Sequence, residues 1–306
     1  PSCSPENKFQ LPNGKSFNLC MGPTMDIEIT RAVLTLTLRS AEILKLDAAG
    51  STYADLLQRA RAALAKLPPF KITRDGRLQE WPEDYADHEP GHRHISHLWA
   101  LFPGDQITPR GTPALAKACR ATLDKRLAAG GGSTGWSRSW IINCMARLED
   151  GDAAYENILQ LFRQSTRHNL FDVCGLKENS PFQIDGNLGG PTGLIEMLLQ
   201  SHASDAQPGV NIVRLLPALP KTWPTGAFRG LRARGGLEVD LTWANGKATV
   251  GTLKATLDRT HRIAAPKGQT IASITSSDKH KTPSIQPANE ISLPIQSGET
   301  VRLHFA

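Results

Sequence analysis

Apolar residues between about positions 24 and 202 recur at the spacing of helices that each bury one face. In the first of these segments Ile29, Val33 and Leu36 lie on one side if the chain is helical. The other expected helices are one opened by Ser51, the 93–102 segment, one after Thr112-Pro113, one around 136–144, one capped by Asp152 and one near 190–201. Thr24 is the expected cap of the first helix. The pattern predicts about seven helices, joined by polar loops rich in glycine and proline.

The pattern changes from about residue 211. Apolar and polar residues alternate in Leu237–Leu241, and again at 291–293 and 301–305, as they do in half-buried strands. The pair Asn245-Gly246 is a hairpin signal, because both residues tolerate the left-handed backbone of a tight turn. Helices followed by strands favour separate packing units. The expected fold class is mainly α with a C-terminal antiparallel β module, divided into residues 1–205 and a β-sandwich-like domain over 206–306.

The composition is that of a globular protein, with 40% hydrophobic and 21% charged residues. No apolar run approaches the roughly 20 residues of a bilayer span, so we expect no membrane partner. The net charge of +6 arises in residues 211–306, where 13 Lys+Arg face 6 Asp+Glu. These basic residues are scattered and lack interleaved aromatic residues, which argues against a nucleic-acid partner.

The five cysteines show no metal-binding spacing. Cys3 and Cys20 flank one loop and could form a disulfide in an oxidising compartment, or remain free. The chain begins at Pro1 with neither an initiator methionine nor a signal-peptide pattern, so we expect it to be the interior of a longer protein.

Three histidines and an arginine crowd into residues 91–97, GHRHISH. An extended backbone places His92 and His94 on one side, and a helix places His94 with His97, so no single regular conformation presents all three to a metal. No CxxC or HExxH motif accompanies them. Carboxylates and aromatic rings at 79–85 precede them, and this mixture suits a sugar, which stacks its C–H face and hydrogen-bonds its hydroxyls. Capping or packing roles stay open for each histidine, and metal binding is the less favoured alternative.

Two carboxylates lie in irregular segments ahead of helices. Glu6 follows a proline in the opening stretch PSCSPEN, and its local sequence favours a surface glutamate over a catalytic one. Asp185 lies in PFQIDGNLGG, beside glycines that would let backbone and ligand come close. Local chemistry leaves two roles open for Asp185, the N-cap of the following helix and a catalytic base.

Several segments together resemble glycoside hydrolase family 95, which contains α-L-fucosidases and some α-L-galactosidases. They are PSCSPEN, LQEWPEDYADHEPGHRHISHLWALFPG, GWSRSW, PFQIDGNLGGPTGLIEMLLQSH and LLPALPKTWPTGAFRGLRARGG. Order and spacing agree from residue 1 to about 245, and the HRHISH and QIDGN blocks are the most specific. The resemblance implies the second half of an (α/α)6 barrel, about helices 6–12, followed by a β module. The first half of the barrel, absent from this chain, is therefore an expected partner.

By position, Glu6 resembles the family's general acid and Asp185 the residue that polarises the attacking water, with Glu80 as the alternative acid. The implied reaction is inverting hydrolysis of terminal α-L-fucosyl or α-L-galactosyl residues from oligo- or polysaccharides. In the family two asparagines of an earlier loop hold the water, and this chain has no matching segment.

The resemblance also implies which residues bind the sugar. Arg93 and His94 resemble residues that contact its hydroxyls and ring oxygen, and Trp136 and Asn187 lie in matching blocks. His92 and His97 are expected to fix the loop. No metal or cofactor is implied, and the family suggests a secreted, periplasmic or cell-surface protein.

Other functions remain open at this point. The chain could be an inactive or sugar-binding fragment of such an enzyme, since the asparagine pair is missing. A metal-dependent hydrolase or lyase that uses the three histidines is a second alternative, and a disaccharide phosphorylase with a similar barrel is a third.

Overall fold

The computed structural model describes residues 1–48, 50–175, 179–202, 211–277 and 285–306. Their contacts form two compact units, Pro1–Ile107 with Thr112–Gly132, and Thr108–Gly111 with Ser133–Ala306. The domain boundary expected at 205/206 falls within 203–210, outside the described residues.

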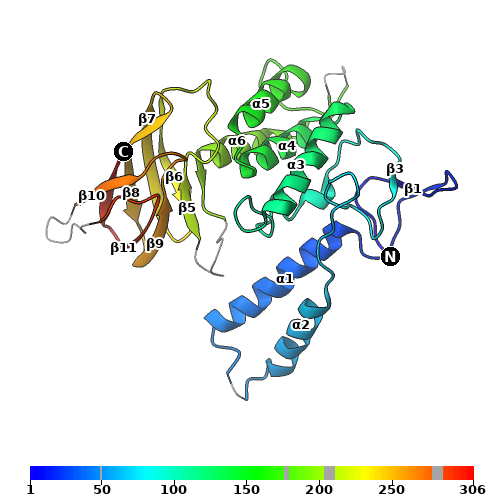
Figure 1. Cartoon of the computed structure of the whole chain (residues 1–306), viewed down its shortest axis with the longest axis horizontal. Helices are drawn as coiled ribbons and strands as arrows, with labels where there is room; N and C mark the ends of the chain where they lie inside the picture. Colours follow the sequence, from blue (N-terminus) through cyan, green and yellow to red (C-terminus); the bar gives the residue numbers. More distant parts are fainter. Residues whose placement is uncertain (49, 176–178, 203–210, 278–284) are drawn as a thin grey trace. The chain divides into compact units, whose positions relative to one another are not determined.

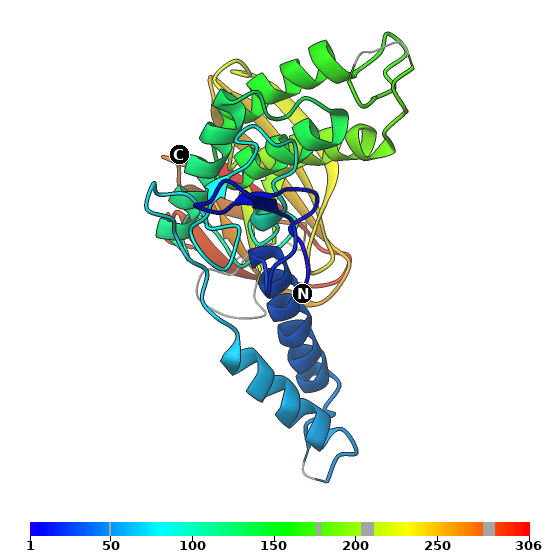
Figure 2. The same ribbon diagram turned by 90° about the vertical axis from the view of Figure 1, so that its right-hand side faces the viewer.

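The first unit is built around a helical hairpin. Its helices α1 (Thr24–Ile43) and α2 (Ala54–Lys66) run side by side (Figure 1 and Figure 2). The remaining elements are α3 (Pro113–Ala128), the 3-10 helix η1 (Ser96–Leu98), and the strands β1 (Phe9–Gln10), β2 (Ser16–Phe17) and β3 (Ala86–Asp87), paired in the order β2-β1-β3. This unit carries both the opening loop and the histidine segment.

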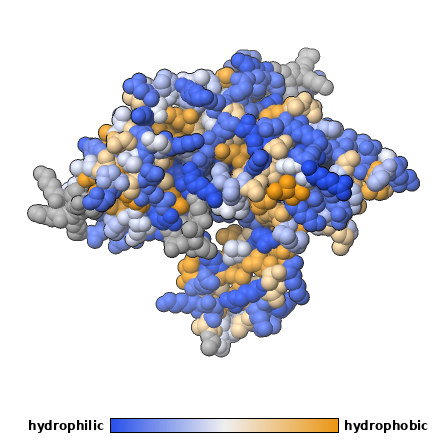
Figure 3. All heavy atoms as spheres, viewed as in Figure 1, coloured by the Kyte–Doolittle hydropathy of each residue, from blue (hydrophilic) through white to orange (hydrophobic). Residues whose placement is uncertain are grey.

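Much of the apolar face of the hairpin is exposed. Val33 and Leu36 of α1 are 54% and 60% exposed, and Leu56 of α2 is 52% exposed. Together they line a groove between the two helices, and Figure 3 shows apolar residues gathered along this part of the chain. The helical periodicity predicted for α1 is confirmed, but little of its apolar stripe is covered by the described residues.

In the second unit two helices, α5 (Gly151–Ser165) and α6 (Ile184–Leu198), pack against α4 (Gly135–Arg147). A capping box of Thr134 and Ser137 starts α4, and every residue of this helix except Trp136 is buried. The close approach of α6 to α4 requires glycine. A Cβ on Gly193 would lie 2.4 Å from Ile142 Cγ2. The glycines beside Asp185 were expected to let a ligand come close. In the structure Gly189 and Gly190, like Gly193, lie against side chains of the neighbouring helices, and approach of a ligand stays a prediction.

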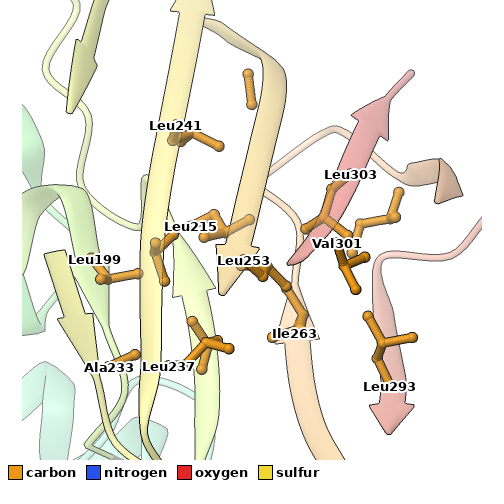
Figure 4. Packing of buried hydrophobic residues seen from close by; sticks show 14 of the residues in the cluster. Leu199, Leu215, Ala233, Leu237, Leu241, Leu253, Ile263, Leu293, Val301 and Leu303 are labelled. Atoms are coloured by element: carbon orange, nitrogen blue, oxygen red, sulfur yellow. The ribbon is translucent and has the colours of Figure 1, made fainter. Parts of the chain in front are cut away.

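Two sheets form the C-terminal part of the second unit. One has the strand order β10-β12-β8-β7-β6 and the other β11-β9-β5-β4. The strands are β4 (Leu199–Gln200), β5 (Ile212–Leu215), β6 (Gly226–Ala233), β7 (Leu237–Ala244), β8 (Lys247–Ala255), β9 (Arg259–Ala264), β10 (Ile271–Ser276), β11 (Glu290–Ile295) and β12 (Thr300–Phe305). Buried side chains of both sheets share one hydrophobic core (Figure 4), so this part is a sandwich.

The strand predictions are confirmed in detail. Leu237, Val239 and Leu241 of β7 are buried at alternate positions. Asn245 and Gly246 have φ of +53° and +72° and join β7 to β8 as the expected hairpin. One strand pair departs from the expected antiparallel module, because β5 pairs in parallel with β9. The chain between them builds β6, β7 and β8 of the other sheet, and a crossover of that length permits a parallel pair.

The helix predictions need three corrections. The described residues contain six α-helices, and the 93–102 segment forms only η1, because its backbone bonds are mostly of the tighter i→i+3 kind and Pro103 ends it. Helix α1 begins after Pro23, and the Thr24 hydroxyl donates instead to the Gln79 carbonyl. The N-cap of α5 is Asp150, not Asp152. Within the described ranges, none of the helices combines the length and apolarity that crossing a bilayer requires.

Candidate active site

The opening loop folds as a turn that presents Glu6. The Asn7 N–H donates to the Ser4 carbonyl at 2.8 Å, so Pro5 and Glu6 lie at the tip. The Glu6 side chain is 61% exposed and its carboxylate pairs with the Arg93 guanidinium. The carbonyl of Pro5, the residue before Glu6, accepts a hydrogen bond from the Ser96 hydroxyl. The structure thus joins the opening loop to the histidine segment.

His94 lies against the same loop, with its Nδ1 3.3 Å from the Pro5 carbonyl oxygen. A carbonyl oxygen can only accept, so we assign the ring proton to Nδ1, and Nε2 is left as an acceptor. Burial, helped by the nearby Arg93 charge, lowers the pKa of His94 below its usual range. A sugar hydroxyl can donate a hydrogen bond to the neutral His94 ring and accept one from the Arg93 guanidinium, so this pair of side chains suits a sugar.

Glu80, the alternative acid, has the opposite surroundings. It is buried, and its two carboxylate oxygens accept from Ser4 Oγ at 2.7 Å, Asn7 Nδ2 at 3.0 Å and Arg126 Nη2 at 2.8 Å. Burial alone would raise the pKa of Glu80, but His97, Arg126 and Ser4 outweigh it and lower this pKa to about 2. A group that stays ionised and enclosed has no proton to give a substrate, which argues against the acid role.

The other two histidines have contacts within the loop, as expected. His92 Nδ1 accepts from the His94 backbone N–H at 3.1 Å, and the buried His97 places its Nδ1 3.5 Å from Glu80 Oε2. Across the described residues, no group of three His, Cys, Asp or Glu side chains is arranged to hold a metal ion. Cys3 and Cys20 are free thiols.

Asp185 lies at the other candidate position, in the first turn of α6. The helix begins at Ile184 with Gln183 in the N-cap position, so the N-cap role considered for Asp185 is wrong. Its exposed carboxylate is favourably placed against the helix dipole. The backbone N–H of Trp136 donates to Gln183 Oε1 at 3.2 Å, which ties the start of α4 to the start of α6. The half-buried Trp136 ring packs on Trp140 with 5.2 Å between centroids.

Asn187 holds the loop that precedes α6. Its Oδ1 accepts from the Asp172 backbone N–H at 2.8 Å, and its Nδ2 donates to the Leu170 carbonyl at 2.8 Å. Contacts of Arg93, His94, Trp136 and Asn187 with a sugar stay predictions.

Asp172 is a buried carboxylate that the sequence analysis missed. It lines a pocket between α5 and α6, and a Cβ on Gly186 would lie 2.0 Å from its Oδ2. Burial raises its pKa to about 6, against weaker opposing hydrogen bonds from Thr166 and the Val173 backbone. The one available signal was an aspartate set between apolar neighbours in NLFDVCG.

Glu6, Arg93, His94 and Glu80 belong to the first unit, and Trp136, Asp185 and Asn187 to the second. Each set is described within its own unit. The pairing of Glu6 with Asp185 across one pocket therefore stays a prediction.

Comparisons with known proteins agree with these motifs. The chain matches the glycosyl hydrolase family 95 catalytic domain over residues 1–198 and the glycoside hydrolase family 95 C-terminal domain over residues 200–303. It is 41% identical to alpha-L-fucosidase 2 of Arabidopsis thaliana over 253 residues, which are 80% of this chain and 28% of that protein. Probable alpha-fucosidase A of Aspergillus niger is 32% identical over 197 residues, 62% of this chain and 24% of that protein. The chain thus spans less than a third of the length of these relatives.

Among solved structures, a GH127 beta-L-arabinofuranosidase from Geobacillus stearothermophilus T6 aligns with 93% of this chain and 42% of its own, at 11% identity and a TM-score of 0.26. A likeness this weak does not establish a shared fold, so the barrel stays a prediction. The two family matches together cover residues 1–198 and 200–303, and on that basis the chain belongs to glycoside hydrolase family 95.

Proposed function

We propose that this chain is the C-terminal part of an inverting glycoside hydrolase that removes terminal α-L-fucosyl, or α-L-galactosyl, residues from oligo- or polysaccharides outside the cytoplasm. Family membership and the names of its relatives support the substrate class. The observation that carries the proposal is the exposed Glu6 carboxylate at the tip of a turn, where it pairs with the Arg93 guanidinium while His94 lies against the neighbouring Pro5 carbonyl.

In the proposed reaction Glu6 donates its proton to the glycosidic oxygen as the bond to the anomeric carbon breaks. Water, polarised by Asp185, attacks the opposite face of that carbon and passes its proton to the Asp185 carboxylate, which gives a product of inverted configuration. In the free chain Glu6 forms an ion pair with Arg93. Substrate binding has to draw Arg93 to the sugar oxygens, because an ion-paired carboxylate has no proton to give.

The water needs a holder that this chain lacks. The sequence contains no Asn-x-Asn segment to match the family's pair. We therefore place those asparagines in the upstream part of a longer protein, together with the helices that close the barrel. The same gap favours one alternative, in which the chain by itself binds sugar without cleaving it.

The proposal is tested with the full-length protein and a methoxyphenyl α-L-fucoside, whose poor leaving group needs protonation, followed by proton NMR of the first sugar released. We expect the β-anomer to appear first, and both Glu6→Gln and Asp185→Asn to lose most activity while their unfolding transitions stay normal. Release of the α-anomer, or full activity of either variant, would contradict it.

A further inference from the structure

Glu80 connects the candidate acid loop to the interior of the first unit. Its Oε1 accepts from Ser4 Oγ at 2.7 Å and its Oε2 from Asn7 Nδ2 at 3.0 Å. Only Pro5 and Glu6 lie between those two donors in the sequence, so the Glu80 carboxylate is hydrogen-bonded to the turn on both sides of Glu6. Ser4 and Asn7 are themselves buried, at 0% and 1% exposure.

Glu80 is itself held by residues of elements that are far apart in the sequence. Arg126 of α3 donates to Glu80 Oε2 at 2.8 Å and to the Glu89 carbonyl at 3.0 Å. The Glu80 carbonyl accepts from the Thr24 N–H at 3.0 Å, at the start of α1. The position of Glu80 is therefore set by two helices, and that of the Glu6 turn is set by Glu80.

The charge of Glu80 is needed for this arrangement. Three side chains donate to its two oxygens, and a carboxylate accepts from all of them. A glutamine amide can at best keep its oxygen toward Asn7 and Arg126 and turn its NH2 toward the Ser4 hydroxyl, and its bond to Arg126 then lacks the negative charge. Charge-assisted bonds of this kind are shorter and stronger than neutral ones. They also lie in a buried site, where a group left unpaired is costly.

We propose that Glu80 is a positioning residue for catalysis, which holds the Ser4–Asn7 turn so that the Glu6 carboxyl meets the glycosidic oxygen. The inference rests on the proposed role of Glu6 as general acid. It replaces the alternative in which Glu80 donates the proton itself. A displacement of the acid by even a fraction of an ångström should reduce proton transfer while leaving sugar binding intact.

The test uses the dependence of the rate on the leaving group. The dinitrophenolate of a dinitrophenyl fucoside leaves without protonation. The leaving oxygen of a methoxyphenyl or alkyl fucoside must be protonated by the general acid. In the full-length protein, Glu6→Gln should lose about a hundredfold or more in kcat/KM on the poor leaving group and little on the good one. Glu80→Gln should show the same selective loss, about tenfold on the poor leaving group and under about threefold on the good one.

Two further variants keep the test decisive if Glu80→Gln fails to fold. Ser4→Ala removes one donor but leaves the Glu80–Arg126 pair intact, and we expect a smaller loss with the same leaving-group selectivity. Glu42→Gln, which changes an exposed glutamate of α1 in the same unit, serves as the matched control and should behave as the parent protein.

The outcomes separate the two claims. If Glu6→Gln loses activity selectively while Glu80→Gln and Ser4→Ala lose it equally on both substrates, or not at all, Glu80 has no positioning role. If Glu6→Gln itself shows no leaving-group selectivity, the proposed acid is wrong and this inference falls with it.

Discussion

At the scale of single residues, surroundings decide what each carboxylate of this chain can do. Glu6 is exposed and pairs with one arginine, Glu80 is enclosed by donors that hold it ionised, and Asp172 is buried with too few donors to offset that burial. The same functional group is thus a candidate acid in Glu6, a fixed negative charge in Glu80, and in Asp172 a carboxyl that keeps its proton to a higher pH than usual.

Arg93→Ala should impair catalysis more than Lys247→Ala. We expect a ten- to hundredfold loss in kcat/KM for Arg93→Ala, or about 1.5–3 kcal/mol, because the guanidinium would contact sugar oxygens in a desolvated pocket. Lys247 is exposed at the start of β8, and its variant should match the parent. The measurement is steady-state kinetics of the full-length protein, and equal kinetics of the two variants would remove Arg93 from the site.

Asp172→Asn should change how stability depends on pH. The pKa of Asp172 is raised from 3.8 to about 6, so between these pH values the folded chain holds a proton that the unfolded chain has lost. The contribution of this proton to the free energy of unfolding is complete below about pH 4. It is lost as the pH rises through 6, and the loss is roughly 3 kcal/mol at most. Asparagine cannot ionise, so the free energy of unfolding of the variant should lack this fall. Urea unfolding of both chains from pH 4 to 7 is the check, and parallel curves would contradict the assignment.

At the scale of elements, glycine placement explains how α6 packs. Gly189 faces Ser139, Gly190 faces Leu161 and Gly193 faces Ile142, each closer than a Cβ would allow. The Asn143 amide uses this closeness to donate to the Gly189 carbonyl at 2.9 Å. Because Asp185 and Gln183 lie at the start of the same helix, this packing also fixes where they sit in the second unit.

Gly193→Ala should destabilise the chain despite the higher helix propensity of alanine. The propensity gain is about 1 kcal/mol, while a Cβ 2.4 Å from Ile142 Cγ2 requires the two helices to separate, and overpacking of this kind costs about 1–3 kcal/mol. Thr192→Ala, at the neighbouring exposed position, should change stability by less than about 0.5 kcal/mol. Thermal unfolding of both variants gives the comparison. A Gly193→Ala variant more stable than the parent would show that the helices do not pack this closely.

At the scale of the whole molecule, the described residues leave part of the apolar surface uncovered, and the proposed reaction needs a water holder that no Asn-x-Asn segment of this sequence supplies. Val33, Leu36 and Leu56 are exposed along one groove, and large exposed apolar patches usually mark an interface. In a protein as long as its relatives, the upstream part is available to cover them.

The chain alone should therefore hydrolyse an aryl α-L-fucoside poorly or not at all. Positioning of a reactant is worth about 7–11 kcal/mol, so loss of the water holder should outweigh an intact acid. Addition of a separately produced upstream half should restore activity. Full activity from the chain alone would contradict both the fragment hypothesis and the assigned origin of the asparagines.

In the full-length protein, the Glu6 and Asp185 carboxyls should face one pocket about 6.5–9.5 Å apart, the separation that leaves room for a water in inverting enzymes. A crystal structure of that protein with a bound sugar provides the measurement. A separation near 5 Å would instead indicate a retaining mechanism.

Sequence patterns by themselves determined what depends on local order. Alternation along β7, the Asn245-Gly246 turn and the helical periodicity of α1 were all predictable, because they follow from side-chain spacing and backbone preference. Family membership followed in the same way, from motifs read along the chain.

Contacts between distant residues were decided only by the tertiary structure. Glu80 could not be told from a catalytic acid until Ser4, Asn7 and Arg126 were seen to surround it. The α6 glycines could not be assigned to packing until α4 was placed against them. The parallel pairing of β5 with β9 likewise depends on a long connection through the other sheet. Ionisation and close packing depend on what lies within a few ångströms in space, and the neighbours that supply those contacts here are dozens of residues away along the chain.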